Sequence, residues 1–162
     1  STLFPYTTLF RSVRPVRGAQ VIVDTSALMA ILLDEPDAAL YARTLAGATS
    51  LAMSAATWVE AAIVVEAHSR GQGGGALDAL IRQAGIRIEP VTESQAYTAR
   101  EAYLNFGKGR HPASLTMGDC FSYALAKCSG EPLLFKGEDF SKTDITPALP
   151  SPQTSSRQPR RK

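Results

Sequence analysis

The stretch Val21-Ile22-Val23-Asp24-Thr25-Ser26-Ala27 decides the fold of this 162-residue chain. Three consecutive β-branched apolar residues predict a short strand that is buried on both faces, as in a parallel sheet. Asp24 follows this strand directly. Ligands of open parallel sheets bind beyond the carboxyl ends of the strands, which makes Asp24 a candidate site residue. The same acid is also in position to cap the helix that we expect at residues 26–33.

Short apolar strands alternate with helices along the rest of the chain. Strands are expected at 21–23, 51–53, 87–91 and 132–135, and a last short one from Ile145. Helices are expected at 26–33, from Pro36 to about 46, from about 54 to 69, from after residue 75 to about 84, at 93–106 and at 116–128. Ser54 is the expected N-cap of the third helix, and a glycine-rich loop at 71–75 precedes the fourth. This alternation predicts an α/β fold with a short, mostly parallel sheet that helices cover on both faces.

The sequence predicts one domain, at residues 21–146, between two appendages. Residues 1–20 read as a non-native or disordered leader, and positions 3–12 resemble the translation of a common sequencing adapter. Residues 147–162 contain four prolines with Ser, Gln and Arg, a composition that predicts a disordered tail. The longest apolar stretch has seven residues, against roughly twenty for a membrane span, and no secretory signal is visible. We therefore expect a cytoplasmic protein without a membrane segment.

Cysteine and histidine contribute little to the candidate chemistry. Cys120 and Cys128 lie eight residues apart in one expected helix, which separates them by about 12 Å of rise and excludes a disulfide between them. Free thiols are consistent with a reducing cytosol. Neither of the two histidines lies in a pattern with zinc spacing.

The net charge of +2 conceals an acidic domain. Residues 21–146 contain ten Lys and Arg against fifteen Asp and Glu, a charge of −5. Such a domain does not bind a polyanion by charge alone, so a nucleic-acid ligand requires a bound cation.

Further carboxylates join Asp24 as candidates. Glu60 interrupts an otherwise apolar helical stretch, where an ionised side chain needs a partner, a metal or a path to solvent. Asp119 follows Thr116 by three residues, the spacing of a capping box, and it also lies where that helix begins. Glu138 and Asp139 follow the last main strand, although either could be an ordinary turn residue. Acids gathered at one end of a sheet repel one another unless a hard divalent cation such as Mg²⁺ binds between them.

Together these motifs resemble a known family. The quoted stretch at 21–27, Glu60 in a helix, Gly118-Asp119-Cys120-Phe121 and Leu133-Leu134-Phe135-Lys136-Gly137-Glu138-Asp139-Phe140 resemble the PIN-domain ribonucleases, and most closely the VapC toxins of type II toxin–antitoxin pairs. The resemblance covers residues 21–145. It implies a three-layer α/β/α sandwich, usually a homodimer, that is inhibited by a VapB-type antitoxin.

The resemblance also implies roles for individual residues. Asp24 and Asp119 match the metal-binding aspartates, and Glu60 matches the acid of the third helix. Gly137 falls where many relatives have an aspartate, so the fourth acidic role is assigned to Asp139, with Glu138 and Asp144 as substitutes. The implied activity is Mg²⁺-dependent hydrolysis of RNA, with Mn²⁺ able to substitute, to leave a 5′-phosphate and a 3′-hydroxyl.

Three basic residues are candidates for contacts with the RNA backbone. Lys108, Arg110 and Lys136 flank the expected strand ends and bring positive charge to an acidic rim. For each of them, an ordinary solvated loop position is the alternative.

Two other classes of protein share parts of this pattern. A non-catalytic PIN-like module that binds RNA or an antitoxin is possible, but such a module has no reason to keep four mutually repelling acids. A receiver-type signalling domain requires an acid pair after the first strand and an aspartate after the middle one, where this chain has Asp24-Thr25 and Met53-Ser54. A phosphate-binding loop at 71–75 is disfavoured because the glycines follow a helix and lack the Gly-Lys-Ser/Thr ending.

Overall fold

The sheet has four parallel strands, and β1 lies in its interior. The computed structural model describes residues 19–69 and 73–150. The strand order is β3-β2-β1-β4, with β1 (Gln20–Val23), β2 (Ser50–Ser54), β3 (Ile86–Glu89) and β4 (Leu133–Leu134). All three pairings are parallel. The carboxyl ends of the strands therefore share one edge of the sheet, and Asp24 lies at that edge.

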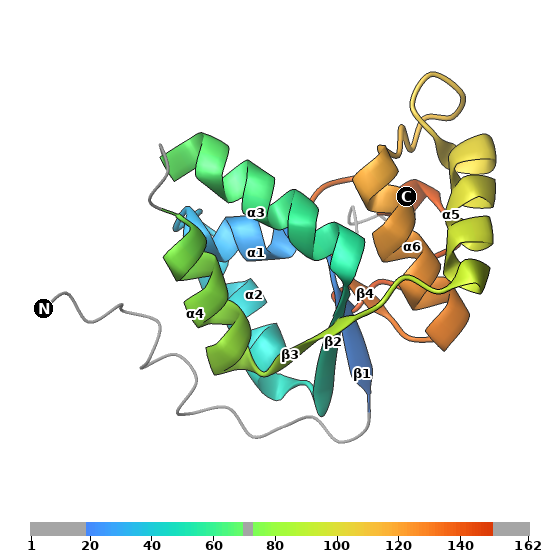
Figure 1. Ribbon diagram of the computed structural model, residues 1–162. Helices are drawn as coiled ribbons and strands as arrows, with labels where there is room; N and C mark the ends of the chain where they lie inside the picture. Colours follow the sequence, from blue (N-terminus) through green and yellow to red (C-terminus); the bar gives the residue numbers. More distant parts are fainter. Residues whose placement is uncertain (1–18, 70–72, 151–162) are drawn as a thin grey trace, which may run out of the picture.

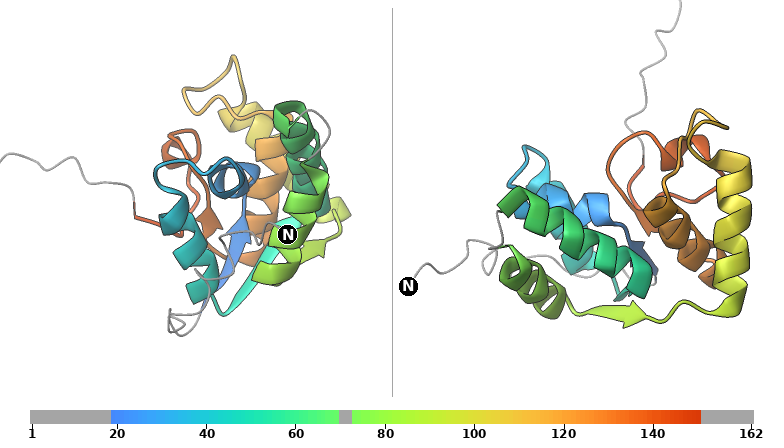
Figure 2. Two further views of the ribbon diagram at one scale, coloured as in Figure 1. Left: turned by 90° about the vertical axis from the view of Figure 1, so that its left-hand side faces the viewer. Right: turned by 45° about the horizontal axis from the view of Figure 1, so that its top comes forward.

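Helices cover both faces of this sheet, as the sequence predicts. One face carries α1 (Thr25–Leu32), α2 (Ala38–Gly47), α3 (Ala55–Ser69) and α4 (Gly74–Ala84), and the other carries α5 (Glu93–Phe106) and α6 (Met117–Ser129). A short 3-10 turn, η2 (Phe140–Lys142), follows β4. Figures 1 and 2 show α5 and α6 paired on the side of the sheet opposite α1 to α4. The three-layer α/β/α sandwich is thereby confirmed.

Alternating side chains along the strands build two separate cores. Val21 and Val23 pack with α1 to α4, whereas Ile22 between them packs with α5 and α6. All three are at most 7% exposed. Because both faces of β1 are buried, its residues 21–23 are all apolar instead of alternating between apolar and polar. Packing on both faces also fixes the position of β1, and therefore of Asp24, which follows it.

The ordered domain extends beyond the predicted boundaries at both ends. Gln20 belongs to β1, and the carbonyl of Ala19 accepts a hydrogen bond from Thr49 N. At the other end, Ala148 and Leu149 pack against the core. The packed residues therefore continue at least three positions past the predicted boundary at residue 146. The expected leader at 1–18, the tail from 151 and residues 70–72 lie outside the described part of the chain.

Two local predictions also need correction. The predicted strand from Ile145 is a single parallel bridge between Leu133 and Pro147, because proline lacks the N–H that would extend a ladder. The predicted glycine loop ends earlier, since α4 begins at Gly74. The side chain of Glu66 accepts a hydrogen bond from Gly74 N at 2.8 Å and satisfies this first helical N–H.

The two cysteines follow the prediction that no disulfide joins them. Cys120 and Cys128 are both free thiols. Among residues 19–69 and 73–150, no helix is long and apolar enough to cross a lipid bilayer.

Candidate active site

Asp24 is buried at the carboxyl end of β1, and both of its carboxylate oxygens accept hydrogen bonds. Its side chain caps α1 by accepting from Ser26 N at 3.0 Å, and Oδ2 also accepts from Ser26 Oγ at 2.6 Å. Ser122 Oγ donates to Oδ1 at 2.6 Å. The residue is 2% exposed. The predicted helix cap is thus present, and the role of Asp24 as a site residue stays a prediction that this cap does not contradict.

Three hydroxyl groups that the sequence did not single out support the two acids on this side of the site. Ser122 donates its only hydroxyl proton to Asp24, so Thr57 Oγ1, 3.0 Å from Ser122 Oγ, must donate to it. Thr25 Oγ1 donates to Glu60 Oε2 at 2.9 Å. Ser122 and Thr57 are fully buried. A serine inside the apolar run of α6 was the available signal, since buried hydroxyls need partners.

Glu60 projects from α3 toward the beginning of α6. A Cβ on Gly118 would collide with the Glu60 carboxylate. Glycine at this position therefore provides the space that the carboxylate occupies. Burial raises the pKa of Glu60, the hydrogen bond from Thr25 opposes that rise, and the charges of Asp24 and Asp119 add to it.

Asp119 is the third helical residue of α6 and forms the predicted capping box with Thr116. Its Oδ2 accepts from Thr116 N at 2.7 Å and from Thr116 Oγ1 at 2.8 Å, while Thr116 Oγ1 accepts from Asp119 N. Burial raises the pKa of Asp119, the backbone hydrogen bond from Thr116 lowers it, and the charges of Asp24 and Asp139 raise it further.

Asp139 remains our prediction for the fourth acidic position. The charge of Asp139 contributes to the raised pKa of Asp119. Asp144 is engaged elsewhere, because it accepts from Tyr123 Oη at 2.7 Å and from Lys127 Nζ at 2.6 Å. Hydrogen bonds from these two groups lower the pKa of Asp144. Glu138 is exposed in the same turn as Asp139 and remains an alternative.

The three predicted RNA contacts differ in their surroundings. Lys108 and Arg110 are exposed in the loop between α5 and α6, and the Arg110 guanidinium lies 5.9 Å from the centroid of the Tyr103 ring. Lys136 forms ion pairs with Glu35 and Asp37 instead. Two carboxylates neutralise its charge, so Lys136 is a poor candidate for a phosphate contact.

The four acids have the chemistry of a magnesium site but do not form a closed cage. In the described ranges, no three Asp, Glu, His or Cys side chains are grouped closely enough, as they stand, to hold a metal ion. Mg²⁺ characteristically uses one or two carboxylates and keeps several waters. The bonds of Asp119 to Thr116 both use Oδ2, and Glu60 accepts from Thr25 through Oε2, so each acid has a second oxygen that these bonds do not use. The donor set therefore fits a cation bound by few protein oxygens.

Fold and site together define an α/β/α protein with four electrostatically coupled carboxylates at the carboxyl edge of a parallel sheet. The sequence model of the PIN domain matches residues 21–145. Ribonuclease VapC30 of Mycobacterium tuberculosis is 50% identical over 131 residues, which are 80% of this chain and all of that protein. Ribonuclease VapC of Mycolicibacterium smegmatis is 51% identical over 125 residues, 77% of this chain and 97% of that protein. The chain therefore belongs to the PIN-domain family, among the VapC toxins.

Solved structures have the same fold. The crystal structure of M. tuberculosis VapC20, described as a sarcin-ricin loop cleaving toxin, has a TM-score of 0.64 at 20% identity and covers 78% of this chain and 96% of its own. A chain of a toxin–antitoxin complex from Klebsiella pneumoniae has a TM-score of 0.55 at 18% identity, over 76% of this chain and 92% of its own. At these identities the likeness concerns the fold alone.

Proposed function

We propose that this chain is the toxin of a type II toxin–antitoxin pair and acts as a Mg²⁺-dependent endoribonuclease in the cytoplasm. The observation that carries the proposal is the cluster of four acids from four separate segments, in which the charge of one raises the pKa of another. Structures keep such repulsion when a bound cation offsets it. The relatives named ribonucleases support the same activity for this chain.

Asp24 and Asp119 would hold Mg²⁺, with Mn²⁺ as a substitute. The ion, when bound, supplies charge neutralisation of the phosphodiester and lowers the pKa of water. Asp24 is held by Ser26 and Ser122, so its carboxylate cannot rotate away from the site. Asp119 is held in the same way by Thr116.

Glu60 is the proposed proton acceptor. The water oxygen attacks phosphorus in line, one water proton moves to Glu60 Oε1, and the P–O3′ bond breaks. The departing O3′ takes a proton from solvent and becomes a 3′-hydroxyl, while the phosphate stays on the 5′ side. Burial raises the pKa of Glu60, which brings it closer to the operating pH and makes it a better base. Asp139 is the alternative base and would otherwise orient the water.

Metal removal tests this activity. The full chain is incubated with bacterial RNA in Mg²⁺, in Mn²⁺ and in EDTA. We expect cleavage with either metal, its loss in EDTA, and its return when metal is added in excess. Fragments that ligate directly to an adapter through their 5′ ends would establish the 5′-phosphate, whereas fragments with a 2′,3′-cyclic phosphate would contradict the mechanism.

A non-catalytic PIN-like module is the second candidate. The specific observation on its side is that the described acids form no three-ligand group as they stand. This candidate predicts RNA or antitoxin binding without cleavage under any metal condition. An antitoxin is expected in either case, and we propose that it covers the acids with a cationic segment.

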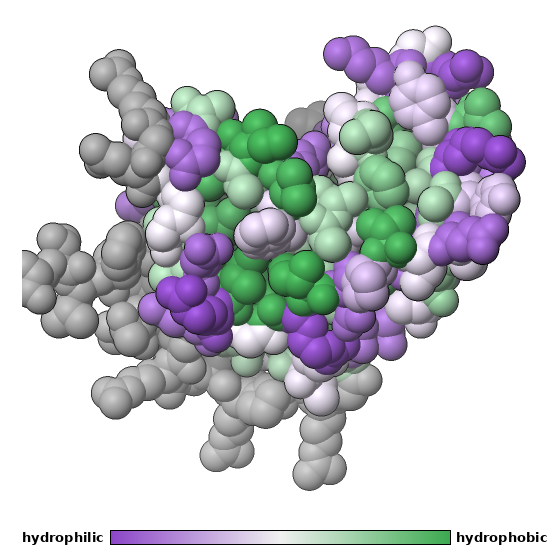
Figure 3. Space-filling view, in the orientation of Figure 1, coloured by the Kyte–Doolittle hydropathy of each residue, from purple (hydrophilic) through white to green (hydrophobic). Residues whose placement is uncertain are grey.

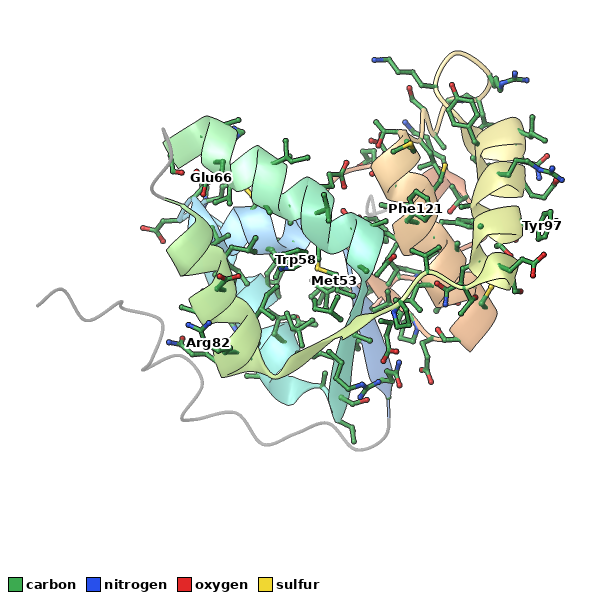
Figure 4. The ribbon with its side chains drawn as sticks, in the orientation of Figure 1. Met53, Trp58, Glu66, Arg82, Tyr97 and Phe121 are labelled. Carbon is green, nitrogen blue, oxygen red and sulfur yellow. The ribbon has the colours of Figure 1, made fainter. Side chains whose placement is uncertain are left out.

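We also propose a homodimer, and a surface between α3 and α6 is suited to a second copy. Val59, Ile63 and Met117 are 47%, 65% and 75% exposed and line one hollow of about 320 Å³, which Glu60 and Gly118 also line, so this surface adjoins the proposed site. Figure 3 shows the apolar surface over α3, and Figure 4 shows Phe121, another lining residue, on α6 between α3 and α5. In a dimer with a two-fold axis, this apolar surface would contact the same surface of the second copy.

Ile63→Glu is therefore expected to shift the dimer toward monomer at micromolar concentration, because a charge would be buried in an apolar contact. Light scattering after gel filtration measures the mass. Leu40→Glu on α2, where Leu40 is 42% exposed, is the control and should stay dimeric. A wild-type monomer, or an Ile63→Glu dimer, would disprove this surface.

A further inference from the structure

Lys136 links the end of β4 to the connection between α1 and α2. Its Nζ donates to Glu35 Oε2 and, at 2.7 Å, to Asp37 Oδ1. Hydrogen bonds to Asp37 and Glu35 raise the pKa of Lys136 above its usual range, so it is a cation. Its side chain is 32% exposed, and the partner carboxylates are 33% and 38% exposed. These contacts turn the charge of Lys136 toward the protein.

The main chain of the same residue reaches the acid cluster through one hydroxyl. Lys136 N donates to Ser26 Oγ at 2.9 Å, and Ser26 Oγ donates to Asp24 Oδ2 at 2.6 Å. A serine hydroxyl has one proton, and the N–H of Lys136 occupies a lone pair of its oxygen. The single hydroxyl proton of Ser26 is thereby directed at Asp24 Oδ2.

The segment after Lys136 carries the fourth acid. Gly137 has a φ of 102°, a left-handed conformation that turns the chain sharply. Asp139 follows two residues later, near enough to Asp119 to raise its pKa. The rings of Phe135 and Phe140, on either side of this turn, lie 5.1 Å apart. The turn is thus held at Lys136 on one side and by this ring contact on the other.

We propose that Lys136 is a positioning residue of the metal site, whose ion pairs with Glu35 and Asp37 fix the turn that orients Ser26 on Asp24 and presents Asp139 to Asp119. This inference rests on the proposed function, since it takes the acid cluster to bind a divalent cation. It replaces the predicted contact between Lys136 and RNA.

Calorimetric titration of the full chain with Mn²⁺, without RNA, tests the inference. Lys136→Met is expected to weaken Mn²⁺ binding about tenfold, the effect typical of groups that orient metal ligands. Lys136→Arg, which keeps the charge for both carboxylates, should bind within about threefold of wild type. If Lys136 acted by its charge alone, Lys136→Met would bind Mn²⁺ more tightly than wild type, because loss of a cation beside an acidic cluster strengthens metal binding.

Two further variants keep the test decisive. Lys127→Met removes another surface ion pair, with Asp144 at 2.6 Å, and should leave Mn²⁺ affinity unchanged. Ser26→Ala cuts the link to Asp24 without changing charge and should also weaken Mn²⁺ binding. If Lys136 acts through Ser26, the effects of Lys136→Met and Ser26→Ala are less than additive in the double variant.

The outcomes separate this inference from the proposed function. A wild-type protein that binds no Mn²⁺ overturns the metal site and this inference with it. A wild-type protein that binds Mn²⁺ while Lys136→Met binds it equally or more tightly overturns the inference alone. Tighter RNA binding by the double variant Glu35→Gln/Asp37→Asn, together with unchanged Mn²⁺ binding by Lys136→Met, would instead restore Lys136 as an RNA contact.

Discussion

Asp119→Asn is expected to lower metal-dependent RNA cleavage by about 10²- to 10³-fold, the loss typical when one group that stabilises the transition state is removed. The melting temperature should change by only a few degrees. Both hydrogen bonds from Thr116 end on Oδ2 of Asp119, and the single carbonyl oxygen of Asn can accept both. The substitution therefore keeps the cap of α6 and removes the negative charge. Cleavage is measured on the same RNA pool, beside a thermal melt.

The control is Asp78→Asn, the same chemical change on the exposed surface of α4. It should cleave RNA like the wild type. Asp24→Asn is a poorer test, because both oxygens of Asp24 accept from donors and an amide NH₂ would face one of them. Full activity of Asp119→Asn would refute the metal-binding role of this carboxylate.

Gly118→Ala is expected to lower RNA cleavage without lowering the melting temperature. The new Cβ collides with the Glu60 carboxylate, which lies at the end of a flexible side chain and can move away. Alanine is also a better helix former than glycine, by roughly 0.5–1 kcal/mol. The melting temperature should therefore hold or rise, whereas a displacement of Glu60 by about 1 Å should reduce cleavage by roughly 100-fold.

Gly75→Ala on α4 is the matched control, since a Cβ there meets nothing within 4 Å. It should leave cleavage unchanged. In a Glu60→Gln background, Gly118→Ala should cause little further loss, because the two changes disturb the same group. Wild-type activity of Gly118→Ala would show that Glu60 does not act from the position seen here.

The fold was predictable because its signals are local. Three β-branched residues at 21–23 identify a strand buried on both faces, and the spacing of Thr116 and Asp119 identifies the start of a helix. The end of the domain was less predictable. Whether Ala148 and Leu149 pack on the core depends on the neighbouring strand, and the prolines around them are typical of a tail.

The supporting groups of the site could not be predicted from the sequence. Asp24 and Ser122 are 98 residues apart, and Thr57 and Ser122 are 65 apart, so only the packing of α6 against β1 and α3 reveals their contacts. The ion pairs of Lys136 were equally unpredictable, because a basic residue near a strand end looks like a phosphate ligand. Its partners Glu35 and Asp37 lie about a hundred residues earlier, and nothing local indicates the pairing.

The position of β4 beside β1 has a consequence for how the protein is made. Among the described strands, the last in sequence, β4, pairs with the first, β1, and Asp139 is synthesised 115 residues after Asp24. At roughly 5–20 residues per second, roughly 6–23 s of translation separate the two acids. A growing chain lacks a complete acid cluster until most of the domain has left the ribosome. Under the proposed function, the site therefore stays incomplete while residues 1–138 are being made.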